Sequence, residues 1–168
     1  VFFKHGRIGQ KGERFSVLKF RSMVPNADKL LQDLLRSDPC RREEWERDMK
    51  LKDDPRVTNI GAFLRKTSLD ELPQMINIIK GDIGLVGPRP ERIEFVRELE
   101  KDIPHYNIRH ITKPGFTGWA QINFRYARTP MDTYEKFQYD LYYLKNRSLI
   151  LDISILLKTI NLLFRRKK

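Results

Sequence analysis

Two adjacent carboxylates in a basic setting make residues 65–74 the most chemically informative segment of the chain. The segment reads Arg-Lys-Thr-Ser-Leu-Asp-Glu-Leu-Pro-Gln, with Asp70 and Glu71 side by side. The 168 residues carry a formal net charge of +11. Cations that hold phosphates beside a carboxylate that attacks or binds a metal are typical of phosphate chemistry. The segment therefore indicates a site that handles phosphate groups.

The same residues have a purely structural interpretation. Ser68 and Glu71 have the spacing of a capping box, whereas Pro73 favours a helix that begins at Asp70. Either alternative predicts a helix over about residues 70–80. A helix N-terminus favours negative charge and would keep Asp70 ionised, as a nucleophile or metal ligand must be. Acidic residues are common at helix starts simply as caps, and spacing alone favours the cap over an active site.

A second candidate is an arginine enclosed by two prolines, in Gly87-Pro88-Arg89-Pro90. A residue that precedes proline is restricted to extended geometry, so much of the backbone freedom of Arg89 is removed. A preorganised guanidinium suits bidentate binding of phosphate oxygens. A proline-rich turn with a solvated arginine explains this composition equally well.

Other cations stand where predicted elements begin or end. Several of them together indicate convergence on one anionic ligand, although each alone is consistent with a solvated charge. These cations are Lys19, Arg21, Arg65, Lys113 and Arg125. The histidines show no metal-ligand spacing, and a single cysteine excludes an internal disulfide framework.

Hydrophobic periodicity and breaker residues predict the elements that must position these side chains. The helix over 57–65 is expected to turn Val57, Ile60, Phe63 and Leu64 inward. No apolar run approaches the length of about 20 residues that a membrane-spanning helix needs. The predicted elements are a hairpin of strands 1–4 and 14–20, a short strand that runs into a rigid turn over 84–90, a strand at 117–123, and helices over 26–36 (capped by Asn26), 41–51, 57–65, 70–80, 91–102, 130–146 and 149–164.

These elements predict an α/β fold of the mixed α+β kind. We expect a single helix-rich domain over residues 1–168 around a small sheet, with amphipathic helices suited to a membrane surface. The last helix and its basic tail fit either the core or an anionic membrane face. The start at Val1, without methionine, predicts that an N-terminal part is missing.

The net charge by itself also suits a nucleic-acid-binding module without catalysis. That alternative requires a basic recognition helix or an aromatic platform, and the sequence has no recognisable motif for either. A pair of acidic residues amid the cations also argues against it. We therefore expect no nucleic acid among the partners.

Four segments in order resemble the bacterial sugar transferases, the monotopic phosphoglycosyl transferases of the polyprenyl-phosphate pathway. The resemblance covers nearly the whole chain, and four motifs in sequence are far more specific than one. The segments are Lys19-Phe20-Arg21-Ser22-Met23, Arg65 with Ser68-Leu69-Asp70-Glu71-Leu72-Pro73-Gln74, Gly87-Pro88-Arg89-Pro90, and Lys113-Pro114-Gly115-Phe116-Thr117-Gly118-Trp119-Ala120-Gln121.

The resemblance implies transfer of a sugar-1-phosphate from a UDP-sugar to polyprenyl (undecaprenyl) phosphate, with Mg²⁺ as cofactor. It implies that Asp70 is the nucleophile of a covalent phosphosugar intermediate, and that Glu71 is a metal ligand or base beside it. Both carboxylates are then candidate metal ligands. Arg65 and Arg89 would hold phosphates, with Lys19, Arg21, Lys113 and Arg125 as further candidate ligands.

The family also implies a location on the cytoplasmic face of the bacterial cytoplasmic membrane, with an anionic membrane surface as partner; a homo-oligomer stays open. This sequence departs from the family pattern in three places. It begins after the N-terminal membrane hairpin of family members, it has Phe124 where many members have glycine, and residues 36–54 are longer than in the smallest members. The length of that segment suggests the catalytic region of a larger enzyme.

Overall fold

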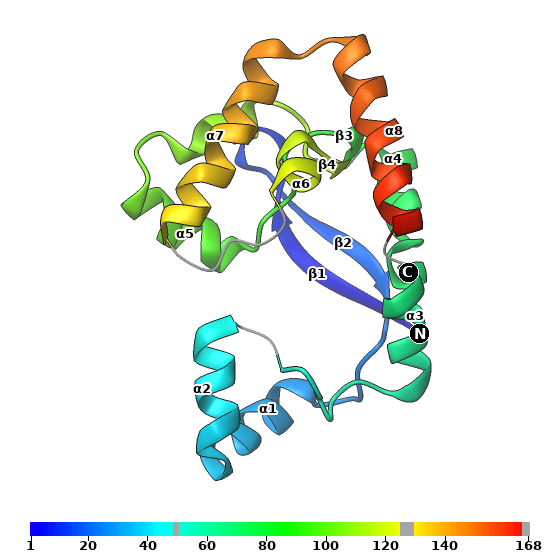
Figure 1. Cartoon of the computed structure of the whole chain (residues 1–168), viewed down its shortest axis with the longest axis vertical. Helices are drawn as coiled ribbons and strands as arrows, with labels where there is room; N and C mark the ends of the chain where they lie inside the picture. The colour runs from blue at the N-terminus through cyan, green and yellow to red at the C-terminus, as the bar shows by residue number, and fades with distance from the viewer. Residues whose placement is uncertain (49–50, 125–129, 166–168) are drawn as a thin grey trace. The chain divides into compact units, whose positions relative to one another are not determined.

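The computed structural model describes residues 1–48, 51–124 and 130–165, and it confirms a mixed α/β fold that is rich in helix (Figure 1). The chain divides into two compact units. The first unit consists of Val1–Phe3 and Leu18–Pro73, and the second of Lys4–Val17 and Gln74–Lys168. Most of the residues predicted to do chemistry beside Asp70 belong to the first unit, and Arg89 belongs to the second.

The predicted N-terminal hairpin is confirmed, although its first strand is longer than expected. Strand β1 (Phe2–Ile8) pairs with β2 (Arg14–Phe20), and a 3-10 turn, η1 (Gln10–Gly12), joins them. Gly12 has a φ of 79°, in the left-handed region that glycine adopts without a steric penalty. In the first unit, the rings of Phe2 and Phe20 stack with their centroids 5.6 Å apart.

The first unit contains the predicted helices over 26–36 and 41–51, with shifted ends. Helix α1 (Ala27–Ser37) packs on α2 (Pro39–Asp48), and α3 (Asn59–Thr67) leads into the 3-10 turn η2 (Leu69–Glu71). Asn26 does precede α1, but its φ is 63° and its side chain makes no capping hydrogen bond. The prediction that Asn26 caps this helix with its side chain is therefore wrong.

A buried ion pair stabilises the loop that follows α2. The guanidinium of Arg56 donates to both carboxylate oxygens of Asp54, with Nε–Oδ1 and Nη2–Oδ2 distances of 2.8 and 2.6 Å. The same guanidinium lies 5.3 Å from the ring centroid of Trp45, which belongs to α2. Bidentate pairing and a cation–π contact together attach α2 to the chain that leads into α3.

The inward face of α3 differs from the prediction. Ile60 and Phe63, expected inside, are 75% and 60% exposed. Gly61 is buried instead, and a Cβ on it would overlap the carbonyl group of Ser22. Since this contact joins residues far apart in the sequence, the apolar periodicity of the helix could not reveal which face is covered.

Gly61→Ala is expected to destabilise the protein by about 2–3 kcal/mol, because the new methyl group meets backbone atoms that cannot rotate away. Thermal unfolding monitored by circular dichroism checks the loss. Gly84→Ala is the matched control, since its Cβ would lie no closer than 3.4 Å to its neighbours. Equal unfolding temperatures for the two variants would contradict the close contact at Gly61.

The second unit is built around a short parallel sheet. Strand β3 (Gly84–Val86) pairs with β4 (Gly115–Thr117) in the register Gly84↔Gly115 and Val86↔Thr117. Helix α8 (Leu149–Arg165) packs against both strands, and α6 (Trp119–Asn123) lies against α7 (Pro130–Asn146) and α8. The helical elements are α4 (Gln74–Lys80), α5 (Ile93–Asp102), η3 (Tyr106–Ile111), α6 (Trp119–Asn123), α7 (Pro130–Asn146) and α8 (Leu149–Arg165).

The prediction of a strand over residues 117–123 is wrong. The strand ends at Thr117, and α6 begins two residues later. Gly118 marks the change: its backbone is fully extended, and a Cβ there would overlap the carbonyl oxygen of Gly87. This close approach brings the residues after β4 against the turn that follows β3.

The hydrophobic core of the second unit lies between α5, η3 and α7. Its buried residues are Val96, Ile103, Tyr106 and Phe137, and Ile8, Leu99 and Leu141 pack against them. Within the described ranges, no helix combines the length and the apolar character needed to cross a membrane.

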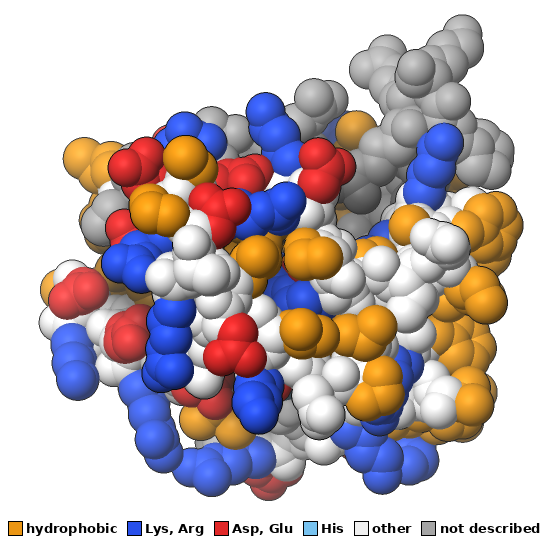
Figure 2. All heavy atoms as spheres, turned by 90° about the horizontal axis from the view of Figure 1, so that it is seen from below, with side chains coloured by type: hydrophobic (Ala, Val, Ile, Leu, Met, Phe, Trp, Pro, Cys, Tyr) orange, Lys and Arg blue, Asp and Glu red, His pale blue; other side chains and the backbone are white. Residues whose placement is uncertain are grey.

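Figure 2 shows one face of the molecule, on which acidic side chains are interspersed among Lys and Arg. Exposed hydrophobic side chains gather along one edge of that view. Nucleic-acid phosphates favour a basic stripe or patch. The mixed charges on this face do not support the nucleic-acid-binding alternative.

Candidate functional site

Asp70 and Glu71 lie in the short turn η2, not at the start of a long helix. Ser68 has a φ of 58°, makes no capping hydrogen bond with its side chain, and ends α3. The next helix, α4, begins only at Gln74. Both alternatives for a helix start at these carboxylates, the capping box and a start at Asp70, are therefore wrong.

Glu71 is held by Lys19. The Lys19 Nζ lies 2.5 Å from Glu71 Oε1, and the two side chains are 23% and 25% exposed. Lys19 comes from β2 and Glu71 from η2, so the pair joins the hairpin to the acidic turn within the first unit. A charge-assisted hydrogen bond of this kind gives Glu71 a defined position.

Arg65 and Arg21 occupy different environments. The Nε of Arg65, on α3, donates to the buried hydroxyl of Ser22 at 2.8 Å. This bond fixes the base of a guanidinium whose side chain is otherwise exposed. Arg21 is exposed. Of the two arginines, Arg65 is the better positioned candidate for a phosphate ligand.

The charge of Asp70 is disfavoured by its surroundings. Burial is the largest influence and raises the pKa of Asp70 above its ordinary value of 3.8; the negative charge of Glu71 acts in the same direction, and Lys19 and Arg65 oppose both. The expectation that a helix N-terminus stabilises this carboxylate is therefore wrong. A partly desolvated carboxylate is instead a better nucleophile than a fully hydrated one.

The two carboxylates suit a magnesium ion that is shared with a phosphate substrate. Mg²⁺ is usually bound by one or two carboxylates, substrate phosphates and water, rather than by a cage made only of protein. The described residues contain no cluster of three or more His, Cys, Asp or Glu that could hold a metal ion. Asp70 and Glu71 are the two carboxylates that could hold such an ion together with the phosphates of a substrate.

Arg89 lies in the second unit, in a turn whose backbone is fixed at several points. The amide of Gly87 donates to Thr117 O at 2.9 Å, and the amide of Gly115 donates to Pro88 O at 2.9 Å. Further on, the amide of Ile8 donates to Glu91 O at 3.2 Å. The rigidity that the two prolines predict is thus reinforced by contacts with β4 and β1.

A buried guanidinium also contacts this turn. Arg109, on η3, has a side chain that is 2% exposed. Its Nη2 donates to Arg89 O at 2.8 Å and lies 2.8 Å from Asp140 Oδ2 on α7, and its Nη1 donates to the Tyr106 hydroxyl at 2.7 Å. Charge from Asp140 raises the pKa of Arg109 against the opposing effect of burial, so the guanidinium stays charged. Arg109 therefore joins η3, α7 and the Arg89 turn.

Glu91 forms a second ion pair at the same turn. Its Oε1 lies 2.7 Å from Lys136 Nζ. Burial alone would raise the pKa of Glu91, but the charges of Lys136 and Arg109 outweigh burial and lower it from 4.5 to about 2. Because the folded-state pKa is depressed, the pair stabilises the fold above the unfolded-state pKa and loses this contribution as the pH falls through the folded-state pKa.

Glu91→Gln is expected to lower the free energy of unfolding by about 3 kcal/mol at pH 7, the value that such a pKa shift represents. The difference from the wild type should shrink between about pH 4.5 and pH 2, where the native carboxylate becomes protonated. Urea unfolding of both proteins at a series of pH values measures this difference in the free energy of unfolding. A difference that stays constant down to pH 3 would contradict the assignment.

Lys113 and Arg125 are the two remaining predicted cations. Lys113 directs its Nζ toward Gly81, at the end of α4, 3.4 Å from where a Cβ on that glycine would lie. A cation at a helix C-terminus complements the last carbonyl groups, which is a structural role. Arg125 lies outside the described residues.

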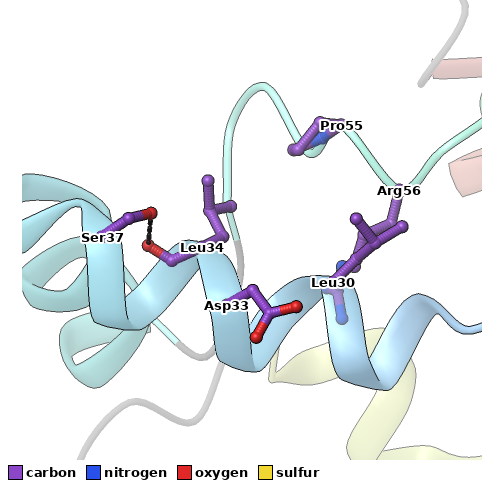
Figure 3. Close-up of a pocket in the computed structure, with 6 residues that line it drawn as sticks. All are labelled: Leu30, Asp33, Leu34, Ser37, Pro55 and Arg56. Carbon is purple, nitrogen blue, oxygen red and sulfur yellow. Dashed lines mark hydrogen bonds between the residues drawn. The ribbon is translucent and has the colours of Figure 1, made fainter.

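A surface hollow in the first unit contains none of the predicted site residues (Figure 3). It has a volume of about 320 Å³ and lies between α1 and the loop with Pro55 and Arg56. Leu30 and Leu34 project from α1 toward that loop, and the Ser37 hydroxyl donates to Leu34 O at 3.2 Å. The hollow is mainly apolar and offers no convergent phosphate ligands.

Sequence reasoning did not identify Arg109, Asp140, Glu91 and Lys136. Arg109 stands four residues before Lys113 and has no regular spacing that marks it as buried. Asp140 lies on α7, where the neighbouring core residues Phe137 and Leu141 are apolar. The only available signal was the presence of ionisable residues close to core positions, which is weak without the fold.

The sequence as a whole matches the model of the bacterial sugar transferase family over residues 1–166. It is 45% identical over 166 residues to the undecaprenyl-phosphate galactose phosphotransferase of Salmonella typhimurium, covering 99% of this chain and 34% of that protein. It is 40% identical over 165 residues to the UDP-glucose:undecaprenyl-phosphate glucose-1-phosphate transferase of Escherichia coli, covering 95% of this chain and 32% of that protein.

A shorter relative is the exopolysaccharide production protein ExoY of Sinorhizobium fredii. The chain is 44% identical to it over 160 residues, which cover 95% of this chain and 68% of ExoY. The chain thus spans only about a third of the length of several relatives and about two thirds of the length of ExoY. One of the longer relatives is an uncharacterized sugar transferase of Haemophilus influenzae, of which the match covers 34%. The match with the family covers nearly every residue described above, and the chain belongs to the bacterial sugar transferase family.

Proposed function

We propose that the protein transfers a sugar-1-phosphate from a UDP-sugar to polyprenyl phosphate, such as undecaprenyl phosphate. The observation that carries the proposal is the position of Asp70: a partly buried carboxylate beside the Lys19–Glu71 pair and Arg65, in a member of this family. Relatives named for undecaprenyl-phosphate sugar transfer support the choice of acceptor.

The reaction proceeds in two displacements at phosphorus. A carboxylate oxygen of Asp70 attacks the phosphorus that bears the sugar, the bond to the UMP phosphate oxygen breaks, and UMP leaves with the bonding electrons. A phosphate oxygen of the lipid then attacks the same phosphorus and releases the Asp70 carboxylate. Dividing the transfer allows a soluble donor and a lipid acceptor to use one nucleophile in turn.

The other residues offset negative charge. Arg65 and Arg89 bind phosphate oxygens, since guanidinium groups match their geometry, and Lys19 orients Glu71. Asp70 and Glu71 would hold Mg²⁺ together with the phosphates of the donor, and the ion would supply positive charge that stabilises the leaving phosphate. The site of action is the cytoplasmic face of the bacterial cytoplasmic membrane, where the product enters exopolysaccharide or other glycoconjugate assembly; the name of ExoY supports this role.

The test identifies the nucleotide that is released when the sugar group is transferred to the lipid acceptor. The full gene product is purified in detergent and incubated with Mg²⁺, undecaprenyl phosphate and each of several UDP-sugars. We expect stoichiometric UMP and lipid-linked diphosphosugar from one preferred donor. Formation of UDP in place of UMP would contradict sugar-phosphate transfer, because it would show cleavage at the glycosidic carbon.

A further inference from the structure

We infer that the buried Arg109–Asp140 pair is a positioning device for Arg89. The inference rests on the proposed function, in which Arg89 binds phosphate. Arg109 acts on the main chain of Arg89, whose carbonyl oxygen it holds at 2.8 Å. Asp140, at 2.8 Å from the same Nη2, fixes that nitrogen.

Burying the Arg109–Asp140 pair costs free energy, which indicates that the pair has a role besides stabilising the fold. The two side chains are 2% and 4% exposed, so both charges have been removed from water. Among the described residues, Arg109 Nε has no hydrogen-bond partner. A buried ion pair is often no more stable than apolar residues of similar volume, and an unsatisfied buried donor is costly. A guanidinium at this position gains the ability to bind a carbonyl and a carboxylate at once.

The contacts of the turn leave little freedom for the backbone of Arg89. Prolines fix the φ angles on both sides, β4 binds the carbonyl of Pro88, β1 binds the carbonyl of Glu91, and Arg109 binds the carbonyl between them. Removing Arg109 frees the one carbonyl that belongs to Arg89 itself. Since the guanidinium is carried at the end of a long side chain, a small backbone rotation displaces it from the phosphate.

The experiment is a mutant cycle in the full gene product, with kcat/KM for the UDP-sugar as readout. The double variant Arg109→Met/Asp140→Leu replaces the pair with apolar side chains. Arg89→Ala is introduced into the wild type and into this variant. If Arg109 acts through Arg89, each change alone lowers kcat/KM by about 10- to 100-fold, but Arg89→Ala lowers it less than about threefold in the double variant. If Arg89→Ala lowers kcat/KM by the same factor in the double variant as in the wild type, the inference is overturned.

Controls separate positioning from folding. Tyr106→Phe removes the Nη1 contact of the same guanidinium and leaves both Nη2 contacts, so it should cost stability but less than about threefold in kcat/KM. Circular dichroism verifies that each variant is folded; if the double variant is not, Arg109→Lys takes its place in the cycle. If Arg89→Ala has no effect on kcat/KM even in the wild type, the proposed phosphate role of Arg89 fails. This outcome differs from equal effects in both backgrounds, which would contradict only the positioning role of Arg109.

Discussion

Asp70→Asn is expected to abolish sugar-phosphate transfer, reducing turnover by at least about 10⁴-fold, because an amide is not a nucleophile toward phosphorus and no other group replaces it. The same variant should form no covalent adduct with the sugar phosphate. Transfer is measured as UMP release coupled to formation of the lipid-linked product. Turnover within tenfold of the wild type would contradict the assignment of Asp70.

The stability of this variant provides the control. Burial and the charge of Glu71 raise the pKa of Asp70, so the fold disfavours the ionised carboxylate at neutral pH. Asparagine carries no charge, and we expect the unfolding temperature to stay equal to that of the wild type or to rise slightly. An inactive variant with a much lower unfolding temperature would indicate a structural role for Asp70 instead.

Arg89→Ala is expected to lower kcat/KM for the UDP-sugar by about 100-fold, the loss typical of removing one preorganised charge that stabilises a transition state. Arg89→Lys should recover part of the activity, since it restores the charge without the planar fork that matches phosphate oxygens. The measurement is initial-rate kinetics over a range of donor concentrations.

The matched control is Lys101→Ala, which removes an exposed cation from α5 and the same unit charge from the protein. Its kcat/KM should stay within about twofold of the wild type. Equal losses for the two variants would indicate that the basic surface attracts the donor only through its overall charge, and that Arg89 has no specific contact.

Local sequence signals predicted the elements that depend on local physics. Helix α7 begins at Pro130, as a proline at the first helical position predicts, and the hairpin forms around its glycine-bearing loop. The predictions were wrong where contacts with residues distant in the sequence determine the structure. Gly61 buries its face of α3 against Ser22, and Gly118 ends a strand because of its contact with Gly87.

The same distinction applies to the candidate site. The motif residues Asp70, Glu71 and Arg89 could be named from the sequence, since their types and neighbours suggest chemistry. Their pairings could not: the candidate cation Lys19 is 52 residues from Glu71, and Arg109 is 20 residues from the carbonyl that it holds. A helix-start argument also gave the wrong sign for the environment of Asp70, because burial and not a helix dipole dominates there.

Trapping of the covalent intermediate is the decisive test of Asp70 as the nucleophile. The full gene product is incubated with Mg²⁺ and UDP-sugar in the absence of lipid acceptor, and its intact mass is measured, with peptide mapping of any adduct. We expect a mass gain of one sugar phosphate on the peptide that contains Asp70, equimolar UMP, and loss of the adduct when undecaprenyl phosphate is added. Rapid transfer to lipid by an enzyme that never carries this adduct, or an adduct on another residue, would contradict it.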